Sequence, residues 1–198
     1  MFAVGHLALG YITGKVADRL LKVKSNIFLI FFVSVIPDID ILIPGLEHGG
    51  PTHSLIIFCI LLIPIILLYG KKAVPYSIAL VQHSLIGDCI TEGTQLLWPL
   101  TSHIYGTGME ITSLPNILLE WCLFLIFIAF AFKTKDIWFF FQHHRFNLLL
   151  STPLFAVLLP TVFNFPIYVP LELLIPHLTF LLLFTLSIMM DLKALLSK

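Results

Sequence analysis

Apolar runs long enough to reach most of the way across a bilayer dominate this chain of 198 residues. Hydrophobic residues make up 59% of it and charged residues 11%, and its mean hydropathy is +1.02. A helix crosses the hydrocarbon core with about 20 apolar residues. The composition and the runs therefore predict an all-α, polytopic transmembrane bundle with about six spanning helices. The expected runs cover residues 27–43, 54–69, 73–90, 114–132, 146–165 and 170–190.

A further helix is expected over residues 2–22, ahead of the first run. Its second half is charged from Lys15 to Lys22, so we predict either an amphipathic helix in the membrane interface or one that is partly inserted in the bundle. The sequence contains no internal repeat and no second soluble segment. We therefore predict one membrane-embedded domain over residues 1–198, with its motifs within residues 1–100.

The positive charges give the predicted spans an orientation. All eleven Lys and Arg residues fall on one side if the six runs alternate in direction, and the positive-inside rule makes that side cytoplasmic. The outward loops 44–53, 91–113 and 166–169 then contain no Lys or Arg. The formal net charge is zero and no basic tract is long enough to follow a phosphate backbone. We therefore expect an integral protein of the cell membrane with membrane lipids around it and no nucleic-acid partner.

Carboxylates and imidazoles recur at membrane depth, where an unpaired ionisable group is costly. Asp38 and Asp40 follow Pro37, whose kink allows an irregular turn that aims both carboxylates at one ion. His53 follows a sharp glycine and proline turn and opens the next apolar run. Carboxylate oxygens combined with imidazole suit zinc, manganese or iron. The sequence therefore predicts a divalent metal site, placed by the orientation near the outer face of the membrane.

The third apolar run adds a polar stripe. Ser84, Asp88 and Glu92 recur at four-residue spacing, which places them along one side of a helix. His83 and Asp88 are five residues apart, or about 140° around a regular helix. A local distortion of the helix or two adjacent ions would reconcile these two ligands. Glu92 or a non-ligating aspartate is the candidate general base, and Glu120 is a candidate second-shell partner or added ligand.

Several short segments together resemble a known family. They are Gly5-His6, Pro37-Asp38-Ile39-Asp40, the stretch from His48 to Leu55, and Asp88 through Leu96-Leu97-Trp98-Pro99. In this order they resemble the YdjM-type inner-membrane metal-dependent hydrolases, which are distantly similar to zinc-dependent phospholipase C. The resemblance implies a hydrolase with zinc as the favoured ion, or manganese or iron. It implies the following residues as metal ligands or their neighbours: His6, Asp38, Asp40, His53, His83 and Asp88.

Two positions depart from the family's pattern. Gly49 stands where the family usually has Arg, which removes a clamp for a phosphate or carboxylate group. The family's histidine precedes its aspartate by four residues, whereas His83 precedes Asp88 by five.

The first functional hypothesis is a membrane-bound, metal-dependent phosphoesterase. A metal-activated water would cleave a phosphoester of a lipid or lipid-linked substrate, with Asp38 and Glu92 as catalytic residues. A second hypothesis is a transporter or ion channel in which intramembrane carboxylates, including Asp88 and Glu120, line a path for protons or metal. A third is a protein whose metal holds the bundle together without turnover.

Overall fold

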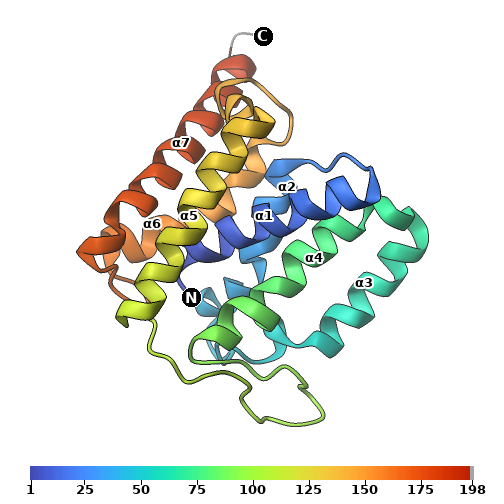
Figure 1. The fold of residues 1–198 in the computed structure, drawn as a ribbon, viewed down its shortest axis with the longest axis vertical. Coiled ribbons are helices and arrows are strands. Elements are labelled where there is room, and N and C mark those ends of the chain that lie inside the picture. The colour runs from blue at the N-terminus through green and yellow to red at the C-terminus, as the bar shows by residue number, and fades with distance from the viewer. Residues whose placement is uncertain (197–198) are drawn as a thin grey trace.

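A computed structural model describes residues 1–196 of the chain, and in these residues the fold is a bundle of helices (Figure 1). No β-strand occurs in them, since Thr94 and Tyr105 form only an isolated bridge. The predicted all-α class is therefore confirmed. The α-helices are α1 (Ala3–Leu21), α2 (Ile27–Val35), α3 (Leu55–Tyr69), α4 (Val74–Gln82), α5 (Leu114–Thr134), α6 (Ser151–Phe163) and α7 (Leu174–Leu196).

Three helical segments are long and apolar enough to cross a membrane: Leu55–Lys72, Leu114–Thr134 and Leu171–Lys193. The expected count of about six spans is therefore not confirmed. The helical segment Asn147–Phe163 is apolar but shorter. In the predicted runs 27–43 and 73–90 the α-helix is only nine residues long. It ends at Val35 in the first run and at Gln82 in the second, and the chain continues as a 3-10 helix or a π-helix.

The change at Val35 has a local cause. Pro37 has no N–H to continue the α-helical ladder, and the chain turns into the 3-10 helix Ile36–Leu42. Other 3-10 turns cover Pro51–His53, Gly70–Lys72, Asp136–Phe141, Asn147–Leu150 and Leu171–Leu173.

Helix α1 lies at the centre of the bundle, between α4 and α5 and against α2 (Figure 1). Most of its first twelve residues are buried, so the structure corresponds to an inserted helix and not to an interfacial one. Glycines allow the close approach of α2, because a side chain at Gly10 would overlap Ser34 and one at Gly14 would press on Ile30.

Lys15 and Asp18, in the charged half of α1, are paired inside the protein, whereas Arg19 and Lys22 are exposed. Lys15 Nζ lies 3.4 Å from Asp18 and 3.1 Å from Asp136 of the 3-10 helix after α5. The hydroxyl of Tyr11 donates to Asp136 at 2.7 Å. These contacts bind α1 to the end of α5 and explain how a charged segment enters the bundle.

Aromatic rings fill the space between α1, α2, α5 and α7. Phe127 stacks on Phe180 with centroids 4.8 Å apart, and Phe31 meets Phe184 at 5.4 Å. Tyr11 meets the edge of Phe127 at 5.1 Å. All five rings are essentially buried, so this packing is the rigid frame on which the polar site is built.

Candidate metal centre

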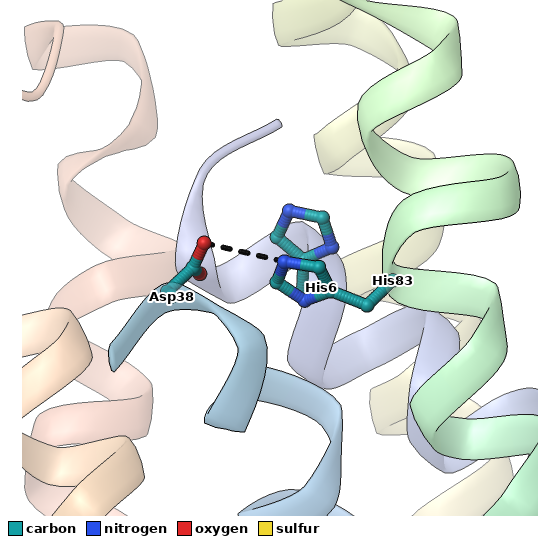
Figure 2. A group of neighbouring side chains, drawn as sticks. All are labelled: His6, Asp38 and His83. Atoms are coloured by element: carbon teal, nitrogen blue, oxygen red, sulfur yellow. Dashed lines mark ion pairs between the residues drawn. The ribbon is translucent and has the colours of Figure 1, made fainter. Parts of the chain in front are cut away.

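The 3-10 helix after Pro37 sends its two aspartates to different places. Asp38 turns toward the interior next to α1 and α4 (Figure 2), while Asp40 lies behind His53. Asp40 is 1% exposed and accepts hydrogen bonds from Thr52 Oγ1 at 2.7 Å and from the Gly49 N–H at 3.3 Å. Of the two aspartates that were expected to face one ion, Asp38 alone lies in the donor groups that could hold one.

His53 is held by the turn that precedes α3. It ends the short 3-10 helix Pro51–His53, and the next residue, Ser54, caps α3 by accepting from the N–H groups of Ile56 and Ile57. Thr52, the other candidate cap, bonds Asp40 instead. The capping fixes the end of the turn, and the His53 ring is fully buried beside the aspartates.

A π-helix brings His83 and Asp88 together. After Gln82 the chain widens into the π-helix His83–Asp88, in which hydrogen bonds span five residues. In a π-helix, two residues that are five positions apart lie on the same side of the helix. In an α-helix this is true of residues four positions apart. This is the local distortion that the five-residue spacing required. Gly87 is part of the fit, because a side chain there would overlap the His6 ring.

Five donor side chains from four segments converge in the interior. His83 Nε2 lies 3.2 Å from Asp38 Oδ1 and 3.4 Å from Asp88 Oδ2. His53 Nε2 lies 3.6 Å and 3.5 Å from the same two oxygens, and 3.2 Å from His83 Nε2. His6 Nε2 lies 3.1 Å from Asp88 Oδ1. Figure 2 shows the rings of His6 and His83 stacked beside Asp38, with centroids 3.7 Å apart.

The contacts of the Nδ1 atoms of His53 and His83 determine which ring nitrogen faces the other donors. His83 Nδ1 donates to the carbonyl of Ser34 at 2.7 Å, and His53 Nδ1 lies 3.2 Å from Asp40 Oδ2. Since a carbonyl and a carboxylate only accept, each neutral ring turns the lone pair of its Nε2 inward. Once His53 has lost its proton, two lone pairs and two carboxylates face one another, an arrangement that suits a cation. The residues present therefore fit a divalent ion.

Without an ion, a proton on His53 supplies positive charge between the carboxylates. Burial disfavours the imidazolium of His53, but hydrogen bonds with Asp38 and Asp40 and the charge of Asp88 raise its pKa to about 10. Burial also opposes ionisation of Asp40, yet hydrogen bonds from His48, His53 and Thr52 hold its pKa below the usual range.

The cluster of histidines and aspartates agrees with the resemblance of the sequence to a metal-dependent family. The model of the YdjM inner membrane protein family matches residues 1–168. This chain belongs to the YdjM family. The match extends well beyond residues 1–100, where the recognisable motifs lie. Searches of the curated proteins and of the solved structures gave no match. Family membership and the apolar helices together make this an integral protein of the inner membrane.

Some residues of this YdjM family member lie outside the group of five donors. His48 is exposed, with Nδ1 3.0 Å from Asp40 Oδ1, and one of its ring nitrogens lies within 4.8 Å of donor atoms of Asp38 and His53. Glu120 is fully buried, and its Oε1 accepts from the Phe2 N–H at 2.6 Å. It therefore fixes the start of α1, four residues before His6, as a second-shell partner would. The sequence could not predict that the Ser34 backbone carbonyl bonds His83, because every residue has a backbone carbonyl.

A cavity of about 680 Å³ opens beside the centre of the YdjM family member. Asp38, His48, Asp88 and Glu92 line it together with apolar residues. Glu92 is exposed and forms no ion pair among the described residues, so its carboxylate faces the cavity without a fixed partner.

Proposed function

We propose that this YdjM family member is a membrane-bound, metal-dependent hydrolase that cleaves a phosphoester of a lipid or lipid-linked substrate. The observation that carries the proposal is the convergence of the Nε2 atoms of His53 and His83 on the carboxylates of Asp38 and Asp88 beside an open cavity. A structural ion would need the ligands but not the cavity. We propose zinc as the ion, since imidazole and carboxylate ligands suit it, with manganese or iron as alternatives.

The residues divide into holding and reacting groups. His6, His53, His83 and Asp88 hold the ion, together with Asp38. A bound divalent ion lowers the pKa of its water and polarises a phosphoryl oxygen. Asp38 is the least buried of the carboxylates within the centre, with 18% of its side chain exposed, so it contacts both the ion site and the substrate.

Glu92 is the proposed general base. It lines the same cavity as Asp38 and Asp88 and is exposed to it, so its carboxylate is free to accept a proton from the attacking water. Asp40 holds the ring of His53 and takes no part in the proton transfer.

We further propose that the centre lies near the outer leaflet. The three candidate spans rise in the same direction in Figure 1, and each carries Lys residues at or just after its far end: Lys71 and Lys72, Lys133 and Lys135, and Lys193. The loops before these spans lack Lys and Arg. The positive-inside rule then places the far ends in the cytoplasm and the ester bond of an outer-leaflet lipid near the centre.

The decisive experiment compares metal content and turnover. Detergent-purified wild type, His53→Ala and Asp38→Asn are reconstituted with zinc, manganese or iron and analysed by plasma mass spectrometry. We expect near-stoichiometric metal in the wild type only, and release of phosphate or of a phosphorylated headgroup from phosphoesters in the same sample. The control His103→Ala alters an exposed loop histidine and should keep both.

Each contrary result has a meaning. Absence of metal from the wild type after reconstitution with each ion would overturn the hydrolase proposal and favour a transport path through the carboxylates. Stoichiometric metal without turnover of any phosphoester would favour the ion as a structural support.

A further inference from the structure

The cavity beside the metal centre has two chemically different walls. The segment that ends the π-helix contributes Asp88, Thr91, Glu92 and Thr94. The lining residues from α6 and the loop after it are apolar apart from Thr152. They are Phe155, Ala156, Leu159, Pro160, Phe165, Pro166 and Ile167. A ligand that fills this cavity must therefore be polar at one end and apolar at the other.

Apolar residues also make up much of the exposed lining of the cavity. Beside the exposed polar residues His48 and Glu92, four large apolar lining residues are exposed: Ile39 by 40%, Leu42 by 55%, Phe155 by 54% and Phe165 by 44%. In a membrane protein such exposure matches hydrocarbon and not water. Exposed apolar lining of this kind suits the entry of a lipid chain.

Charge limits what binds at the polar end. No Lys or Arg lines the cavity, whereas Asp38, Asp88 and Glu92 do. Met1 also lines the cavity, but its N-terminal ammonium lies 3.7 Å from Asp88 Oδ1 and is paired with that carboxylate. An ion at the proposed centre adds the positive charge that attracts a phosphoryl group. The apolar lining residues are then available to contact the remainder of the ligand.

We propose that the apolar wall, formed by Phe155, Ala156 and Leu159 of α6 with Phe165 and Ile167, binds the hydrocarbon chain of the substrate. This inference rests on the proposed function, since it places the cleaved phosphoester at the metal centre. The volume of about 680 Å³ lies within the range of about 300–1,000 Å³ for small-molecule sites. The substrate class is therefore a phosphate ester of one long apolar chain, with affinity rising about fourfold per buried methylene group.

The test is photolabelling of the full-length, zinc-reconstituted protein in detergent. The probe is dodecyl phosphate with a diazirine at the chain end, and labelled peptides are located by mass spectrometry. We expect labelling of α6 or of residues 165–167, suppressed at least tenfold by excess dodecyl phosphate but not by butyl phosphate. The surface of α3 serves as an internal reference, because it is exposed to lipid and should label without competition.

Two substitutions of lining residues reduce the volume of the cavity and test the chain site directly. Ala156→Trp and Leu159→Trp should each lower labelling of this wall at least fivefold. Val162→Trp lies on the same helix but outside the cavity, so it is the matched control and should leave labelling unchanged. The wild-type competition decides the question even if a cavity variant does not fold.

The outcomes separate this inference from the proposed function. Labelling confined to the surface of α3, or not competed by dodecyl phosphate, would overturn the chain site even if the protein binds metal and hydrolyses butyl phosphate. Competed labelling of α6 in a protein without turnover would support the chain site while the hydrolase proposal fails.

Discussion

Two aspartates that are two residues apart have different surroundings in the candidate centre. Asp38 lies among the inward-facing donors, whereas Asp40 bonds the far nitrogen of His53 and the hydroxyl of Thr52. A carboxylate behind a ligating imidazole fixes its tautomer and orientation. The two positions are therefore expected to respond differently to the same substitution.

Asp40→Asn should weaken metal binding without abolishing it. The amide keeps the volume of the side chain but lacks the charge that fixes His53, so we expect the metal Kd to rise by about 10–100-fold with unchanged stoichiometry at saturation. Asp38→Asn should instead lower the stoichiometry. Calorimetric titration of both variants with zinc measures the difference. Equal loss in both variants would place Asp40 in direct contact with the ion.

Metal binding should release a proton from His53. Its raised pKa of about 10 means that the free protein carries this proton at neutral pH, and a ligating nitrogen must lose it. The apparent metal affinity should therefore fall about tenfold for each unit of decrease in pH below this value, through this group alone. Titration calorimetry in two buffers of different ionisation enthalpy counts the protons. An identical heat in both buffers would rule out the protonated His53.

At the scale of elements, the π-helix His83–Asp88 absorbs one extra residue. The resemblance in sequence implies a spacing of four residues between this histidine and this aspartate, which puts both on one side of an α-helix. The wider π-turn does the same for five residues. The extra residue is thus accommodated locally, and the helix before it keeps its packing against α1.

Deleting Leu85 should convert this turn to an α-helix and keep the site. Leu85 is 46% exposed, so its loss removes little packing, and the remaining spacing of four still aligns the two ligands. Metal content should stay near that of the wild type. The control is deletion of Ile78, which is 38% exposed in the regular part of α4 and whose loss rotates the preceding residues by about 100° relative to the ligands. That variant should lose metal or fail to fold. Loss of metal in the Leu85 deletion alone would contradict the explanation.

At the scale of the whole molecule, the charges should orient the bundle with the centre facing outward. In a background without Cys59, Cys89 and Cys122, His103→Cys should react with a membrane-impermeant maleimide in intact spheroplasts. Lys71→Cys should react only after lysis, because the positive-inside rule places it in the cytoplasm. The reverse pattern would move the proposed centre to the cytoplasmic leaflet.

The sequence by itself determined the helical membrane class and most of the donor set. Apolar runs require backbone hydrogen bonds to close within helices, and His6, Asp38, His53, His83 and Asp88 are too costly in that setting without a partner. The helical class depends on composition, and the donor set on the motifs that resemble the YdjM family, so neither needs knowledge of distant contacts.

The tertiary structure alone decided how the elements meet. The central place of α1, the position of Asp40 behind His53 and the contact of Ser34 with His83 depend on residues far apart in the chain. The number of candidate spans also differed from expectation, because apolar runs continue through breaks at Pro37 and at the π-helix. Hydropathy measures solvent preference and carries no information on backbone geometry. The convergence of the five donor side chains exists only once the helices have packed.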